Sequence, residues 1–187
     1  MRDRLRARLA GRVPEKLHIP GFQEAAVLVP LVRRSTSHTL VFTARPSDLP
    51  THGGQISMPG GKRAAGDREP IDTALRETAE ELGLGSASVE VLGLLDDAAT
   101  PLGFVITPVV GWLDDPPAFT PDAREVEDVL ELDLDTLRHP GAYRDAGERV
   151  VGARSYRLHE YHVAGRVIWG ATARIVHQLL ELVGPAN

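Results

Sequence analysis

The chain has 187 residues, of which 42% are apolar, and a formal net charge of −5 at pH 7. This length and composition suit a single globular domain with a sizeable core. The negative charge argues against broad attraction to nucleic acid or an anionic membrane surface. The lack of cysteine excludes disulfides, thiolate chemistry and cysteine-ligated zinc. We therefore expect neither nucleic acid nor membrane as partner, and local cations to meet any anionic substrate.

The first residues predict a helix followed by two strands. Arginines alternate with leucine and alanine over residues 2–11, and this stretch lacks the apolar segment of a secretory signal. Apolar runs at 25–33 and 39–44 predict strands. Nothing in the sequence resembles a membrane span, and we expect a cytoplasmic protein.

A glycine-rich loop precedes the strongest helical signal. The run Met58-Pro59-Gly60-Gly61-Lys62 would let the backbone approach a ligand closely. A helix is expected over residues 70–83, because Pro70 suits the first turn and a glycine suits the end. Either Asp67 or Glu69 could cap its start.

Three glutamates share one side of this predicted helix. At about 100° per residue, Glu80 and Glu81 fall on either side of Glu77, within an arc of roughly 100°. Apolar residues form a stripe on nearly the opposite side, which would pack on a core. Like charges this close repel one another, and a hard divalent cation with a preference for oxygen ligands would relieve the repulsion. The alternative is a solvated acidic face, partly offset by Arg76.

The second half of the chain predicts further strands and a last helix. Expected are strands at 89–95 and at 103–112 with Pro108 at an edge or bulge, an extended segment at 124–132, a helical turn at 134–138, two short strands within 155–169, and an amphipathic helix at 170–183. Glu125 and Glu127 would share one face of the extended segment, either within a site or at an exposed edge. This content predicts an α/β fold with a mixed sheet between helices. We expect one domain over residues 1–187, with a core at about 23–165.

The loop and the acidic helix resemble the signature of the Nudix hydrolases, which hydrolyse a nucleoside diphosphate linked to another moiety. The matching residues are Gly61, Arg76, Glu77, Glu80, Glu81, Gly83 and Leu84. The segment between Gly61 and Arg76 has one residue more than the general pattern, so its acidic position is either Asp67 or Glu69. Thr78 stands where an apolar residue is usual.

A second motif, just before this signature, resembles the branch of the family that cleaves coenzyme A. A strand ending in Thr43-Ala44-Arg45 leads into a loop that contains His52, Gly54-Gln55 and Pro59-Gly60-Gly61. The extra residue in the helix signature is similar to that branch as well. Segments around 105–111 and 169–173 also resemble these enzymes.

The resemblance implies a Nudix-type α/β/α sandwich and hydrolysis of the pyrophosphate of coenzyme A or a derivative, with Mg²⁺ or Mn²⁺ as cofactor. By this resemblance Glu77, Glu80 and Glu81 would hold the metal. One of them, or Glu125, would be the general base. Arg76 would orient Glu80 or the loop.

The candidate substrate-binding residues surround these acids. They are Arg45, His52, Gln55, Lys62, Gly60 and Gly61. Arg45 and Lys62 could bind phosphate oxygens or form surface ion pairs instead. His52 and Gln55 could contact the substrate or order the loop by hydrogen bonds.

Two other functions remain open at this point. A Nudix pyrophosphatase acting on ADP-ribose, NADH or a dinucleotide polyphosphate would carry the same helix signature, and a non-catalytic nucleotide-sensing module would share the fold. The sequence leaves open whether free or acylated coenzyme A is preferred. It also leaves open the identity and number of metal ions, the physiological role and the oligomeric state, for which a homodimer is one option.

Overall fold

The computed structural model describes residues 1–35, 37–47, 54–151 and 154–184. The main sheet contains β1 (Gln23–Arg33), β2 (His38–Ala44), β3 (Ile56–Ser57), β4 (Gly60–Lys62), β5 (Glu90–Leu94), β6 (Ala98–Ala99), β7 (Phe104–Asp114) and β8 (Asp128–Asp133). A second sheet contains β9 (Tyr143–Val151), β10 (Arg154–Val163) and β11 (Arg166–Trp169). The helices are α1 (Arg2–Ala10), α2 (Pro70–Leu82), α3 (Leu134–Arg138) and α4 (Gly170–Val183), with a 3₁₀ turn at Ser86–Ser88.

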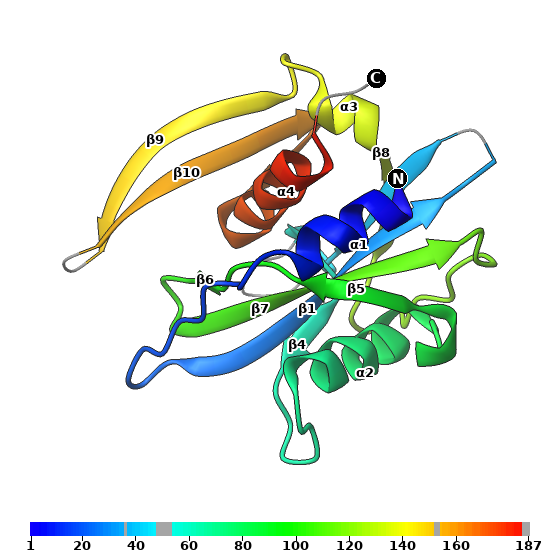
Figure 1. Cartoon of the computed structure of the whole chain (residues 1–187), viewed down its shortest axis with the longest axis horizontal. Helices are drawn as coiled ribbons and strands as arrows, with labels where there is room; N and C mark the ends of the chain where they lie inside the picture. The colour runs from blue at the N-terminus through cyan, green and yellow to red at the C-terminus, as the bar shows by residue number, and fades with distance from the viewer. Residues whose placement is uncertain (36, 48–53, 152–153, 185–187) are drawn as a thin grey trace.

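The main sheet is mixed and lies between layers of helix. Its long strands β1 and β7 run parallel, and β1 pairs antiparallel with β2 and with β4. Helix α2 covers one face, while α1 and α4 cover the other (Figure 1). The predicted α/β/α sandwich with a mixed sheet is confirmed.

Alternating side chains of β1 build two separate cores. Leu28 and Val32 pack with Leu82 of α2, whereas Val29 and Leu31 lie in the core that includes α1 and α4. This alternation follows from the twofold period of a strand, which sends successive side chains to opposite faces. The sheet therefore separates the α2 face from the α4 face.

Pro108 lies inside the sheet rather than at an edge, and it faces an irregularity like the predicted bulge, because residues 95–97 of the neighbouring segment lie opposite residues 107–108. Strand β7 has β1 on one side and both β5 and β6 on the other. The missing N–H causes no lost bond because the partner strand is interrupted there: β5 ends with Leu94 opposite Val109, and β6 begins with Ala98 opposite Ile106. Only the Pro108 carbonyl is used on that side, and it accepts from the Leu95 N–H at 3.0 Å.

The sequence pattern missed β9. This strand contains charged residues and Gly147, whose φ of +89° lies in the left-handed region, so it shows no alternation of apolar residues. It is held by its pairing with β10, as in Tyr143 opposite Tyr161, and this hairpin extends beside α4 (Figure 1). The two strands predicted within 155–169 correspond to β10 and β11.

No helix in the described ranges is both long and apolar enough to cross a membrane.

A pair of stacked histidines joins this hairpin to α4. The rings of His159 on β10 and His177 on α4 lie 4.2 Å apart between centroids. The hydroxyl of Tyr143 is 3.1 Å from Nδ1 of His159, and that of Tyr161 is 3.2 Å from Nδ1 of His177. Burial, together with the nearby His177, lowers the pKa of His159 to about 4. Folded protein therefore holds His159 uncharged at neutral pH.

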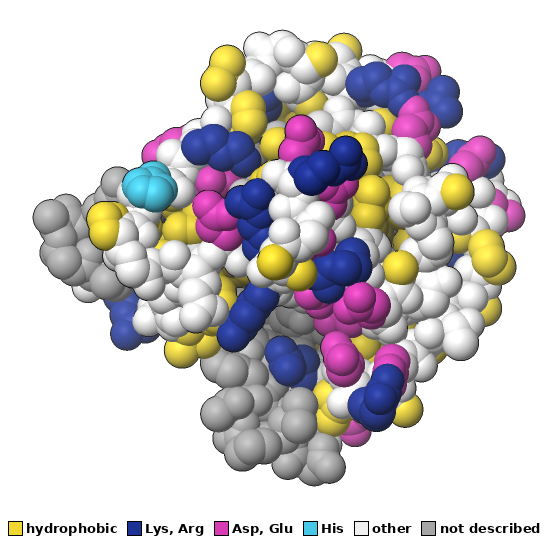
Figure 2. Space-filling view, turned by 90° about the horizontal axis from the view of Figure 1, so that it is seen from below, with side chains coloured by type: hydrophobic (Ala, Val, Ile, Leu, Met, Phe, Trp, Pro, Cys, Tyr) yellow, Lys and Arg dark blue, Asp and Glu magenta, His cyan; other side chains and the backbone are white. Residues whose placement is uncertain are grey.

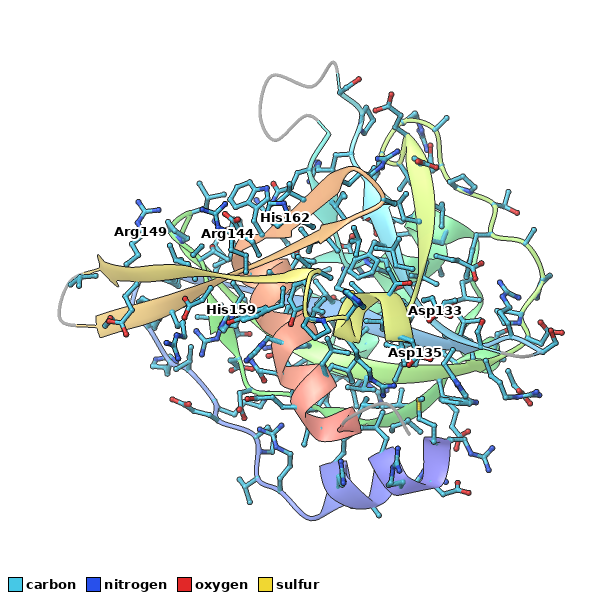
Figure 3. The ribbon with its side chains drawn as sticks, turned by 90° about the horizontal axis from the view of Figure 1, so that it is seen from above. Asp133, Asp135, Arg144, Arg149, His159 and His162 are labelled. Atoms are coloured by element: carbon cyan, nitrogen blue, oxygen red, sulfur yellow. The ribbon has the colours of Figure 1, made fainter. Side chains whose placement is uncertain are left out.

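Stability is expected to fall as the pH drops from about 6.5 toward 4, because the unfolded chain binds a proton at His159 more readily than the folded protein does. The loss from this group would reach about 3 kcal/mol below that window. Denaturant unfolding at several pH values measures the loss, and His159→Phe should show a shallower decline than wild type. The matched control is His162→Gln, an exposed histidine of the same strand (Figure 3), which should keep the wild-type slope. Equal slopes in all three proteins would contradict the assignment.

Candidate active site

Helix α2 begins and ends where its sequence predicts. Glu69 is the residue before the first turn, so the predicted cap is Glu69 rather than Asp67. Pro70 opens the helix, and Asp72 accepts hydrogen bonds from the N–H groups of Arg68 (3.0 Å) and Glu69 (3.2 Å). Gly83 ends it with a φ of +66°, in the left-handed region that favours glycine. The face toward the sheet is formed by the buried residues Thr73, Ala74, Thr78 and Leu82.

The short strand β4 lies directly against the acidic side of α2. A Cβ placed on Gly61 would lie 2.4 Å from Oε2 of Glu77. A Cβ on Gly60 would lie 2.4 Å from the carbonyl oxygen of Ala26, and the φ of Gly60 is +148°. At Gly60 the backbone of β1 leaves no room for a side chain, whereas at Gly61 a side chain would displace the carboxylate of Glu77.

Glu81 is partly buried, and several elements meet at its carboxylate. Its Oε2 accepts the N–H of Gly60 at 3.0 Å. Burial raises the pKa of Glu81 to about 7, and the negative charges of Glu77 and Glu125 add to the rise, while Gly60 and the Arg45 cation oppose it. The fold therefore brings Arg45, Glu77 and Glu125 close enough for their charges to act on Glu81.

Arg76 binds the loop before α2 to the glutamates of the helix. Its Nε and Nη2 donate to the two carboxylate oxygens of Asp67 at 3.2 and 3.0 Å. Its Nη1 donates to Glu77 at 2.8 Å and to Glu80 at 3.2 Å, and Nη2 also reaches the carbonyl oxygen of Lys62 at 3.1 Å. Arg76 thus contacts the loop, Glu77 and Glu80 together.

Asp67, not Glu69, is the loop acid that meets Arg76. Its carboxylate also accepts from the N–H of Ala64 at 2.8 Å and from the hydroxyl of Thr73 at 2.9 Å. The Arg76 guanidinium has the largest effect on the pKa of Asp67, and together with these two donors it holds that pKa far below its usual range. Thr73 was missed by the sequence analysis, although its place one turn before Arg76 on the same helix face could have signalled it.

Glu125 reaches the site from a turn, so the prediction that it shares a strand face with Glu127 is wrong. Residues 123–125 form a turn, and β8 begins only at Asp128. The preceding loop is tied to the end of α2, because the N–H of Asp122 donates to the carbonyl oxygen of Glu81 at 3.0 Å. Burial of Val126 in the α2 core, at 2% exposure, fixes the next residue. Residues 123–125 therefore form a turn that packs on α2, in place of the start of the predicted extended segment.

The other predicted substrate-binding residues are not all near the glutamates. Arg45 follows β2 directly and donates its N–H to the carbonyl oxygen of Gln55 at 3.1 Å, so these two are brought together. Lys62 alternates with Gly61 on β4 and therefore points to the opposite face of the sheet, where its Nζ lies 5.2 Å from the centre of the Phe104 ring. His52 lies outside the described residues. Figure 2, seen from the α2 side, shows acidic and basic side chains gathered on one face.

A family model described as NUDIX domain matches residues 22–171. The chain belongs to the Nudix hydrolases. These enzymes act on phosphoric anhydrides, and the family expected from the acidic helix is confirmed.

Curated relatives and solved structures agree with this assignment. The chain is similar to an uncharacterized Nudix hydrolase NudL from Pectobacterium atrosepticum, with 37% identity over 162 residues, which are 84% of this chain and 81% of the relative. The NudL of Yersinia enterocolitica is 37% identical over 85% of this chain and 80% of its own. Among solved structures, the Nudix hydrolase RenU from M. smegmatis gives a TM-score of 0.54 at 22% identity, covering 70% of this chain and 86% of RenU. A MutT/nudix family protein from Enterococcus faecalis gives 0.52 at 15% identity, covering 94% of this chain and 71% of that protein. At such identities these structures support the fold alone.

The acids of this Nudix hydrolase have the donor chemistry that a hard divalent cation prefers, since carboxylate oxygens are the usual ligands of Mg²⁺ and Mn²⁺. Within the described ranges, no three acidic or histidine side chains converge on one point as they stand. The reason is visible in the contacts: Arg76 holds Glu77 and Glu80, while Glu81 turns to Gly60. The excess negative charge around the partly buried Glu81 still favours a cation there, so the residues fit such an ion by charge and ligand type.

Proposed function

We propose that this Nudix hydrolase cleaves the pyrophosphate of coenzyme A or of an acyl derivative, yielding 4′-phosphopantetheine or its acyl form and adenosine 3′,5′-bisphosphate. The observation that carries the proposal is that the loop after β2 joins Arg45 to Glu81: Arg45 donates its N–H to Gln55 at one end of this loop, and Gly60 donates its N–H to Glu81 at the other. Arg45 belongs to the motif that resembles coenzyme A pyrophosphatases, and Glu81 belongs to the helix signature. One site would thus combine substrate selection with hydrolysis.

The first barrier to this reaction is the repulsion between water as nucleophile and the negatively charged pyrophosphate. A guanidinium such as that of Arg45 can bind phosphate oxygens in pairs and reduce this repulsion. The metal ligands in this proposal are Glu77, Glu80 and Glu81, which would exchange their present partners for the ion. Mg²⁺ or Mn²⁺, when bound, neutralises phosphate oxygens and makes bound water more acidic.

The second requirement is a base for the proton of the attacking water. Glu125 and the helix glutamates are the candidates. Whichever of them acts as the base must be ionised to accept the proton. Arg76 acts on the geometry rather than on the substrate, since its contacts run to Asp67, Glu77 and Glu80. In this proposal a loop, a helix and a turn each supply one part of the reaction: cation, metal ligands and base.

Product identification tests the proposal. The purified protein is incubated with coenzyme A and Mn²⁺, and the products are identified by mass spectrometry. The expected products are 4′-phosphopantetheine and adenosine 3′,5′-bisphosphate, with a kcat/KM at least about tenfold above those for ADP-ribose, NADH and dinucleotide polyphosphates. Comparable or faster turnover of one of these would overturn the coenzyme A assignment, and no turnover of any of them would favour a nucleotide-sensing module.

A variant pair sharpens this test. Arg45→Gln removes the cation next to Glu81 and should raise the KM for coenzyme A by about tenfold or more. Arg33→Gln is the matched control, because Arg33 pairs with Asp114 and lies beside the start of β2, at the opposite end of that strand from Arg45. It should leave the KM unchanged. Equal effects of the two substitutions would show that Arg45 has no specific part in binding.

A further inference from the structure

One carboxylate connects the two segments that carry Arg45 and Glu125. Oε2 of Glu127 accepts the N–H of Ser47 at 2.9 Å, and Oε1 lies 3.4 Å from the Ser47 hydroxyl. The N–H of Glu127 donates to the carbonyl oxygen of Ala44 at 2.9 Å. Ser47 follows Arg45 by two residues, and Glu127 follows Glu125 by two residues. Glu127 therefore spans the gap between the two segments at the site.

We propose that Glu127 is a positioning residue, which holds the Arg45 segment in place and so sets the affinity for the pyrophosphate substrate. The inference rests on the proposed function in one respect, namely that Arg45 binds substrate. The residue would act through Ser47 and Arg45 and would not touch the reacting atoms. Nothing in the helix signature points to this role, because Glu127 lies more than forty residues after it.

Among the described residues, few other hydrogen bonds hold the Arg45 side of this connection. Arg45 is exposed and lies one residue past the end of β2. Its backbone makes two hydrogen bonds to the returning segment: its N–H to the carbonyl oxygen of Gln55, and its carbonyl oxygen from the N–H of Gly54, both at 3.1 Å. The carboxylate of Glu127 adds a charge-assisted contact to the chain just beyond, where β-pairing has ended. Loss of that contact should loosen the segment that presents Arg45.

The Glu125 side is held without the Glu127 carboxylate. The N–H groups of Glu125 and Val126 both donate to the carbonyl oxygen of Asp122, at 3.0 and 2.9 Å. Asp122 is itself bound to α2 through the carbonyl oxygen of Glu81, and Val126 is buried. Removal of the Glu127 carboxylate should therefore disturb substrate binding by Arg45 and leave Glu125 in place.

This asymmetry predicts a split between the kinetic constants. Glu127→Ala should raise KM by about tenfold, with kcat within about twofold of wild type. Glu127→Gln should recover most of the affinity, because the amide oxygen can still accept the N–H of Ser47. The pH profile of kcat should stay unchanged in both variants. If Glu127 acted as a base or a metal ligand instead, Glu127→Gln would be as impaired as Glu127→Ala, and kcat would fall.

The matched control is Glu131→Gln. Glu131 lies on β8 and accepts from Arg34 and Thr39, toward the other end of the strand, and its loss should leave KM and kcat unchanged. Thermal unfolding of each variant reports any general loss of structure. An unchanged KM in Glu127→Ala, a fall in kcat alone, or an equal effect of Glu131→Gln would each overturn the proposal. If wild type does not cleave coenzyme A, the proposed function fails by itself, and the Glu127 effect is measured on the phosphoric anhydride that wild type does cleave.

Discussion

Glu81→Gln is expected to lower kcat by about a thousandfold and to leave the fold intact. The amide keeps the shape of the side chain and can still accept the N–H of Gly60, but it brings no negative charge and cannot take up a proton. A loss of this size is in the range found when an acid–base group or a metal-assisted step is removed. Steady-state kinetics with Mg²⁺ or Mn²⁺ measures it.

The stability of the same variant provides an internal check. Burial and nearby negative charges raise the pKa of Glu81, which means that the folded protein holds this charge at a cost. Glu81→Gln should therefore unfold at the same temperature as the metal-free wild type or at a higher one. Glu69→Gln is a suitable control for the kinetics, because Glu69 flanks α2 but does not meet Arg76. If Glu81→Gln retained more than about a tenth of the activity, the place of Glu81 in the reaction would be refuted.

Two neighbouring glycines should give opposite results when replaced with alanine. In Gly61→Ala the new Cβ would meet Oε2 of Glu77 at 2.4 Å. That oxygen is at the end of a flexible side chain and can move, so stability should change little. Displacement of the Glu77 carboxylate from the site should lower kcat/KM by about a hundredfold.

Gly60→Ala should instead damage the fold. Its φ of +148° is strained for any other residue, and the new Cβ would lie 2.5 Å from the Cα of Val27, which cannot move without shifting β1. We expect a loss of about 2–4 kcal/mol in the free energy of unfolding. Gly66→Ala is the control, since its Cβ would meet no atom within 4 Å. Equal losses of stability in Gly60→Ala and Gly61→Ala would contradict this distinction.

The helix that carries the acids could be predicted from the sequence because its signals are local. A proline at the first turn, a glycine at the end and an apolar stripe all act within a few residues, so Glu77, Glu80 and Glu81 share a face as expected. The choice between Asp67 and Glu69 is different in kind. It depends on which loop residue comes back to contact Arg76. Asp67 and Arg76 are nine residues apart in the chain, and no periodic pattern in the sequence predicts such a contact.

The positions of Lys62 and Glu125 were also beyond local reasoning. Lys62 points away from the glutamates because β4 pairs with β1 in a register that places Gly61 opposite Ala26, and a shift of one residue would reverse the faces. Glu125 lies in a turn because Val126 is drawn into the core beneath α2. Both results depend on partners far apart in the chain, where pairing and packing override the pattern of the segment itself.

The sheet also divides the molecule into two layers that should tolerate substitutions differently. The acids of α2 lie over one face, while the larger apolar core, with α1, α4 and the β9–β10 hairpin, lies over the other (Figure 1). Facing layers in such a sandwich are about 10 Å from the sheet, a distance at which substitutions usually act independently. Stabilising replacements in the α4 layer should therefore accumulate without loss of activity.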